Sequence, residues 1–80
     1  MITTLDKIKP GNGGIIKSVG GQGALRRRLL DMGLTPKTNI KVTKIAPMGD
    51  PMELFLRGYV LTIRLDDAAK IEMIVEEENE

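Results

Sequence analysis

The 80-residue chain contains no cysteine, no histidine and no tryptophan, and its only aromatic residues are Phe55 and Tyr59. Without cysteine there is neither a disulfide framework nor a thiolate metal site, which excludes the small disulfide-rich secreted proteins. Without histidine there is no imidazole base, no Ser–His or Cys–His nucleophile pair and no preferred ligand for a transition metal. An enzyme would have to work with carboxylates or lysine alone, and we expect none.

Long hydrophobic runs are absent as well. Charged residues interrupt each apolar stretch well before the length of a membrane span, and the first ten residues, MITTLDKIKP, lack the apolar core of a signal peptide. We therefore expect a cytoplasmic protein without direct membrane insertion. Nucleic-acid binding needs a basic face and aromatic stacking platforms, and a net charge of +1 with two aromatic residues offers neither, so no nucleic acid is expected as a partner.

The balanced total charge hides a division along the chain. Residues 1–45 carry nine basic and two acidic side chains, a formal charge of +7, whereas residues 46–80 carry three basic and nine acidic ones, a charge of −6. Because a chain this short folds as one compact domain, we expect the two halves to interleave and to pair with each other. So small a core leaves no room for a large interior cavity, and function is expected at the surface or in a loop.

Alternating apolar residues predict a mainly β protein. Strands are expected around 15–19, 40–45, 53–57, 59–65 and 71–75, with a slip in alternation near Ile45 that indicates a bulge. Leu25, Leu29 and Met32 share one stripe of a helix over about 23–32, which Gly33 and Pro36 end. Asp66 is expected to cap a short helical turn over about 67–70. These elements fit one small curled β-barrel over 1–75, and the acidic residues 76–80 form a solvated tail.

Two segments supply the candidate partner contacts. The first is the run Arg26, Arg27 and Arg28 with Leu30 on the expected helix. Consecutive helical residues lie about 100° apart, so the three guanidinium groups fan out, and they serve either as stems along the core edge or as a binding surface. Leu30 lies outside the main stripe and either widens the buried face or contacts a partner.

The second segment is the loop 46–52, in which two prolines and Gly49 make a stiff turn. Its candidate contacts are Met48, Asp50 and Met52, although the two methionines also suit a role in completing the core. For metals, the chain offers only carboxylate oxygens, so weak binding of Fe²⁺ or another divalent cation is the most that we expect, and no cofactor is required.

Several motifs together resemble the FeoA family of the bacterial ferrous iron transport system. They are LRRRLLDMGLTP at 25–36, Ile40 and Val42, APMGDP at 46–51, RGY at 57–59 and LTIR at 61–64. The departures are mild: Lys37 stands where the family usually has glycine, and Asp66-Asp67 stand where a Glu-Ala pair is more typical. The first departure requires Lys37 to adopt the turn conformation without glycine's freedom.

The resemblance implies an SH3-like β-barrel of five to six strands and a non-enzymatic role. That role is to assist the ferrous iron transporter FeoB through contact with its cytoplasmic domain. The alternative is a stand-alone metal-responsive regulatory module, since the family is similar to the SH3-like domains of some metal-dependent repressors. The family has no set of catalytic residues to carry over to this chain.

Overall fold

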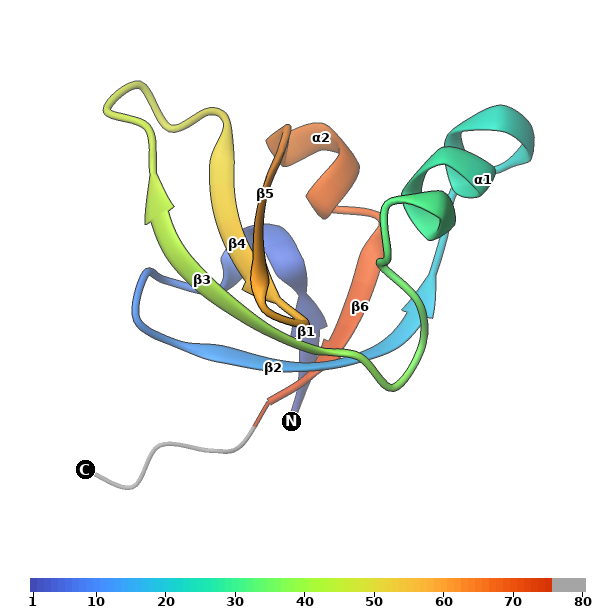
Figure 1. The fold of residues 1–80 in the computed structure, drawn as a ribbon, viewed down its shortest axis with the longest axis horizontal. Helices are drawn as coiled ribbons and strands as arrows, with labels where there is room; N and C mark the ends of the chain where they lie inside the picture. Colours follow the sequence, from blue (N-terminus) through green and yellow to red (C-terminus); the bar gives the residue numbers. More distant parts are fainter. Residues whose placement is uncertain (76–80) are drawn as a thin grey trace.

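The structure is a computed structural model that describes residues 1–75, and the predicted acidic tail at 76–80 lies outside the described residues. The described chain contains six strands (Figure 1): β1 (Ile2–Thr4), β2 (Gly13–Val19), β3 (Asn39–Ile45), β4 (Met52–Leu56), β5 (Tyr59–Ile63) and β6 (Ile71–Ile74). Three helical segments join them: the 3-10 turn η1 (Leu5–Lys7), the helix α1 (Gly23–Asp31) and the short helix α2 (Leu65–Ala68). The predicted mainly β fold is confirmed.

The strands form one antiparallel sheet in the order β1-β6-β2-β3-β4-β5. The sheet curls on itself, so that β1 and β6 lie across from the β4–β5 hairpin, while α1 projects from the end of β2 (Figure 1). Pairing of β1 with β6 brings the two ends of the described chain together. The N-terminal amine of Met1 donates a hydrogen bond to the carbonyl of Val75 over 3.0 Å.

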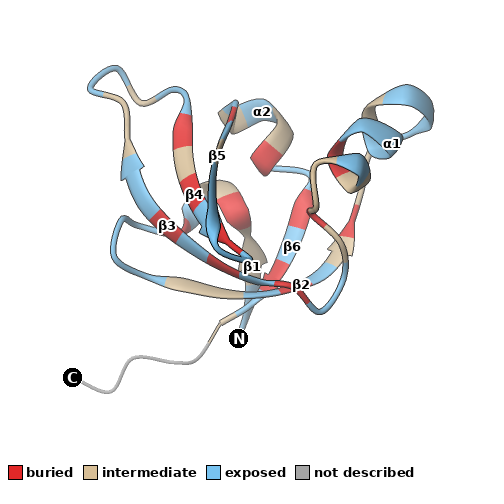
Figure 2. Ribbon diagram, in the orientation of Figure 1, coloured by how far each residue is buried: buried red, intermediate tan, exposed pale blue. Residues whose placement is uncertain are grey.

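The core consists mainly of buried residues of the curled sheet, together with one buried apolar residue from each helical segment. Figure 2 colours the buried residues red. Alternation puts Ile40 and Val42 inside from β3, and Ile71 and Met73 inside from β6, each at most 1 % exposed. Leu5 of η1 and Leu29 of α1 belong to the same cluster and are fully buried. Most aliphatic side chains of the described chain are buried or half-buried, although Ile2, Ile15, Val60 and Ile74 are exposed. A chain of this length needs such burial to offset its conformational entropy.

Helix α1 ends as its sequence predicts. The N–H of Gly33 donates to the carbonyl of Leu30 and the N–H of Leu34 donates to that of Leu29, which is a Schellman ending with Gly33 at a φ of 100°. In the turn that follows, Lys37 adopts a φ of 74°, as the replacement of the family's glycine requires. A lysine in this region costs about 1–2 kcal/mol relative to glycine.

In the two successive hairpins, β3–β4 and β4–β5, the backbone adopts the irregularity and the turn that the local residues favour. The predicted bulge in β3 is confirmed, because the pairing with β4 shifts register between Val42 and Lys44. Strands β4 and β5 are joined by Arg57 and Gly58, with φ values of 51° and 88°. Two successive positive φ values are the mark of a type I′ turn, whose twist matches that of the flanking strands.

The helical turn expected over 67–70 begins two residues earlier. Helix α2 has Arg64 at its N-cap, so Asp66 is inside the first turn and does not cap it. The carboxylate that satisfies an N-terminal N–H of α2 comes from elsewhere in the chain. Asp50 Oδ1 accepts a hydrogen bond from the N–H of Leu65 over 2.9 Å.

The two halves of the chain pair with each other, as the division of charge predicts. Three ion pairs of residues 1–75 join a base of the first half to an acid of the second, and they are Lys17–Glu72, Arg28–Asp67 and Lys44–Glu53. The pairs lie at the surface, and each contributes little to stability by itself. Part of the opposite charge of the two halves therefore meets at the surface of the interleaved fold.

Candidate functional site

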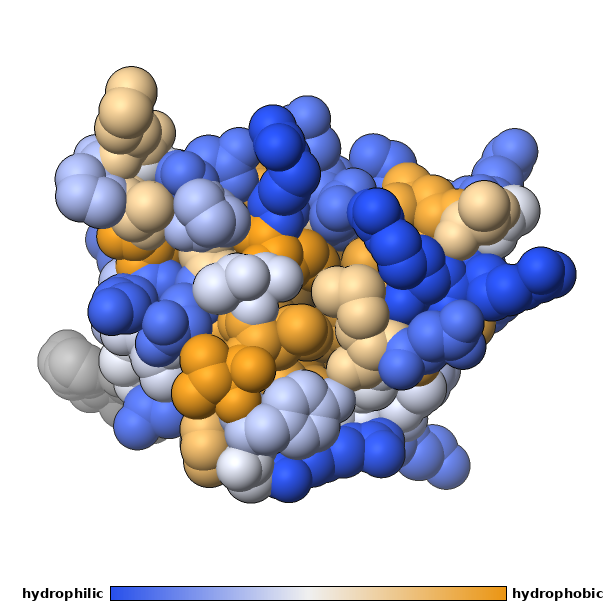
Figure 3. Space-filling view, turned by 45° about the horizontal axis from the view of Figure 1, so that its top comes forward, coloured by the Kyte–Doolittle hydropathy of each residue, from blue (hydrophilic) through white to orange (hydrophobic). Residues whose placement is uncertain are grey.

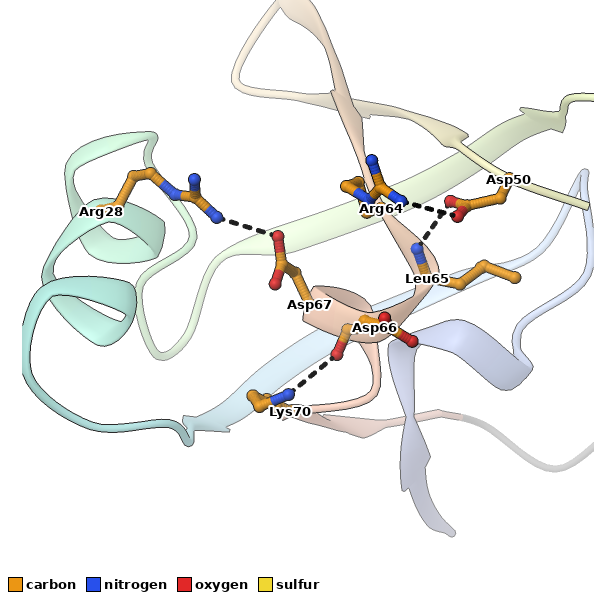
Figure 4. A network of polar contacts seen from close by, with 7 residues as sticks. All are labelled: Arg28, Asp50, Arg64, Leu65, Asp66, Asp67 and Lys70. Carbon is orange, nitrogen blue, oxygen red and sulfur yellow. Dashed lines mark hydrogen bonds and ion pairs between the residues drawn. The ribbon is translucent and has the colours of Figure 1, made fainter.

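Helix α1 is held to the barrel at three points that define one face of the molecule. The first point is Leu29 of α1, whose side chain is fully buried. At the helix end, the Tyr59 hydroxyl of β5 donates a hydrogen bond to the carbonyl of Met32 over 2.7 Å. Along the helix, Arg28 Nη2 lies 3.0 Å from Asp67 Oδ2 of α2 (Figure 4). These contacts place α1, α2 and the β4–β5 hairpin around a common centre.

That centre is an apolar hollow with hydrophilic side chains around it (Figure 3). The elements around it carry half-buried apolar side chains that pack against the core, namely Leu30, Met32, Leu61 and Leu65. An apolar centre inside a charged rim is the usual build of a protein-interaction surface. We call this surface, formed by α1, α2 and β5, the α1 face.

The three arginines of α1 fan out, as their consecutive positions predict. Arg26 Nε donates to the carbonyl of Val19 over 3.2 Å, and Arg28 pairs with Asp67. Arg27 is exposed and has no hydrogen bond or ion pair within residues 1–75. Arg26 and Arg28 thus have a structural role, while Arg27 leaves its guanidinium open to a partner.

The candidates in the β3–β4 loop divide between solvent and core. Met48 is 93 % exposed at the loop tip, so it does not complete the core. Met52 is fully buried as the first residue of β4 and offers no contact surface, which corrects its assignment as a partner contact. Asp50 is committed to α2 through Leu65, and its other oxygen lies 3.9 Å from Arg64 Nη2 (Figure 4).

The predicted contact residues therefore do not form one site. Leu30 and Arg27 lie on α1, Arg28 pairs across to α2 and Arg26 turns back to β2, whereas the β3–β4 loop, which carries Met48, lies on the opposite side of Figure 1 from α1. Tyr59 is a member of the α1 face that the sequence does not reveal. Its place in an alternating set predicts a core residue, yet it is 41 % exposed. Its motif RGY is the one available signal.

The acidic side chains of residues 1–75 are dispersed. No group of three or more acidic residues in this range is arranged to hold a metal ion. Four of the seven are engaged in ion pairs with lysine or arginine, and these are Asp50, Glu53, Asp67 and Glu72. Within the same residues, no helix is long and apolar enough to span a membrane.

Comparison with known proteins gives a consistent result. The sequence pattern of the FeoA domain matches residues 3–75. The chain is 36 % identical over 69 residues to an Fe(2+) transport protein A/Fe(2+) transporter FeoB fusion protein of Porphyromonas gingivalis. That alignment covers 86 % of this chain but only 8 % of the fusion protein.

Solved structures agree with the fold. A FeoA-like protein from Clostridium acetobutylicum superposes with a TM-score of 0.90 at 32 % identity, covering 99 % of this chain and 92 % of that one. FeoA of Stenotrophomonas maltophilia, described as an SH3 domain protein, has a TM-score of 0.75 at 19 % identity, over 92 % of this chain and 89 % of that one. A manganese-dependent transcriptional repressor shares the fold at 11 % identity and a TM-score of 0.83, over 91 % of this chain and 40 % of its own. The predicted SH3-like barrel is confirmed.

Proposed function

Because this chain belongs to the FeoA family of ferrous iron transport, we propose that it is a cytoplasmic accessory protein of iron uptake that binds the cytoplasmic domain of FeoB. The observation that carries the proposal is the fusion protein of Porphyromonas gingivalis, in which a relative of this chain is joined to the transporter. A covalent link of this kind keeps two domains at a high effective concentration. Where the two are separate chains, a binding surface has to supply the same proximity.

The α1 face is the surface that we assign to this contact. Its apolar hollow can bury a few anchoring side chains of the partner, and the charged side chains around it orient the partner. The open guanidinium of Arg27 favours a partner segment that is acidic at its edge and apolar at its centre. The role is one of binding, and it needs neither catalysis nor a resident cofactor in this chain. Divalent cations would meet only weak carboxylate sites.

The test is direct binding of the purified cytoplasmic domain of FeoB, measured by calorimetry with and without guanine nucleotide. We expect Arg27→Glu to weaken the complex about tenfold or more, because one reversed charge opposes the acidic edge of the partner. The substitution should leave the fold intact, because Arg27 is exposed and makes no hydrogen bond or ion pair within residues 1–75.

The matched control is Lys9→Glu, an equal charge reversal in the loop between η1 and β2 and away from α1. It should leave the affinity within about twofold. Equal effects of Arg27→Glu and Lys9→Glu would mean that net charge, and not the α1 face, governs binding. No binding at tens of micromolar in either nucleotide condition would contradict the proposal as a whole.

One observation favours a second function, that of a metal-responsive regulatory module. The repressor that shares this fold is manganese-dependent, although its 11 % identity makes it a likeness of fold alone. Anaerobic calorimetry with Fe²⁺ separates the two functions. A regulator should bind the ion at low-micromolar affinity, whereas an accessory protein that acts by contact alone has no such requirement.

A further inference from the structure

A second surface feature lies away from the α1 face, where the two ends of the described chain meet. It is an open groove between η1, the start of β2, β3 and the end of β6. Three lysines line it, Lys7, Lys9 and Lys41, together with the glycines at 11, 13 and 14 and the apolar side chains of Ile15, Ile74 and Val75. The groove thus combines three basic side chains with apolar ones.

The lysines of this groove have no acidic partner within residues 1–75. The lysines that do form ion pairs there are Lys17 and Lys44, and neither lines the groove. Residues 1–75 as a whole carry twelve basic and seven acidic side chains, a formal charge of +5. Unpaired like charges in one groove raise its affinity for an anionic segment.

The described chain ends at this groove. Val75 lines it and is fixed there, since its N–H donates to the carbonyl of Met1 over 2.8 Å and its carbonyl accepts from the Met1 amine over 3.0 Å. The next five residues are Glu76, Glu77, Glu78, Asn79 and Glu80, which hold four of the eleven acidic side chains of the protein. Five extended residues reach about 17 Å, enough to follow a groove of this kind.

We propose that residues 76–80 dock in this groove of their own chain, with their carboxylates against the ammonium groups of Lys7, Lys9 and Lys41. Two observations favour residues 76–80 as the occupant. Their charge is opposite to that of the groove, and they follow directly after Val75, which leaves the sheet at the groove. A segment tethered at the groove has an effective concentration in the millimolar range, which compensates for exposed ion pairs that are individually weak. The tail is then a built-in competitor for any acidic peptide that approaches the groove.

The first test is by NMR on the full chain. Replacing all four tail glutamates by glutamine should shift the backbone amides of Gly11, Gly13, Gly14 and Lys41, and a variant with Lys7, Lys9 and Lys41 changed to glutamine should not respond to the same replacement. In 0.5 M salt the difference should vanish, because the Debye length falls to about 4 Å. Lys37→Gln, an exposed lysine outside the groove, is the matched control and should leave the response in place.

The second test uses a free peptide, acetyl-Glu-Glu-Glu-Asn-Glu, as the probe. The chain with the neutral tail should bind it at least about fivefold more tightly than the unchanged protein, and the triple lysine variant should not bind it. Amide shifts confined to the residues next to the tail would overturn the proposal. So would shifts that depend on protein concentration, which would place the tail on a second copy. Equal peptide affinity with and without the tail charges would overturn it as well.

Discussion

Gly33 lies where α1 stops against β5, and two requirements meet at this residue. Its φ of 100° is one that residues with a Cβ adopt at a cost. A Cβ on Gly33 would also collide with the hydroxyl of Tyr59, which is held in place by its hydrogen bond to Met32. The glycine thus permits both the helix ending and the close approach of β5.

We expect Gly33→Ala to lower the free energy of unfolding by about 2–4 kcal/mol, the sum of backbone strain and the displacement of Tyr59. Gly49→Ala is the matched control. Gly49 has a similar φ of 91°, but open space surrounds the position of its Cβ, so the loss there should be about 1–2 kcal/mol. Urea unfolding measures both. Equal losses would show that the contact with Tyr59 contributes nothing.

Met48 and Met52 show how far a single residue can be assigned from its type. Both belong to the segment Pro-Met-Gly-Asp-Pro-Met at 47–52, yet Met48 is 93 % exposed and Met52 is fully buried. The difference follows from the start of β4 at Met52, which puts Met52, Leu54 and Leu56 on the inward side of one strand. The sequence leaves both methionines open to either role, because it does not locate the boundary between loop and strand.

Among the elements, α2 depends most on a residue outside itself. It is a single turn of four residues, and the N–H of its first residue, Leu65, is satisfied by Asp50 from the β3–β4 loop. Arg64 adds a second, longer contact to the same carboxylate. The loop and α2 therefore stabilise each other.

Asp50→Ala should cost about 0.5–2 kcal/mol of unfolding free energy, because it leaves the Leu65 N–H without its acceptor. Asp50→Asn retains an acceptor oxygen and should recover most of this loss. Hydrogen exchange adds a local measure, since the amides of 65–69 should lose protection in the alanine variant more than those of β3. An Asn variant as unstable as the Ala variant would assign the effect to charge and not to the cap.

Local pattern predicts most elements of this fold but not all. Alternation in β3 and β6 and the Gly-Leu-Thr-Pro ending of α1 carry enough local information to place these elements. Strand β1 is three residues long, too short for alternation, and it exists because β6 offers it an edge. The start of α2 is misplaced for a similar reason, since its cap lies fifteen residues earlier in the chain.

At the scale of the whole molecule, residues 1–75 contain a six-stranded sheet with its own core. Every buried hydrophobic side chain of the described structure lies between Leu5 and Met73. A chain that ends at Val75 should therefore unfold within about 1 kcal/mol of the full chain, the range of exposed ion pairs. Thermal and urea unfolding check this. A loss of several kcal/mol would mean that the tail has contacts beyond those with surface lysines.

By itself, the sequence determined the mainly β class, the helix with its glycine ending, the pairing of the basic half with the acidic half, and the family. These depend on spacing and composition, which are local or additive properties of the chain. Only the tertiary structure decided that Met52 is core, that Asp50 caps α2, that Tyr59 anchors α1, and that three lysines line one groove beside the last described residue. Each of these depends on which distant segments the curl of the sheet brings together, and no local pattern contains that information.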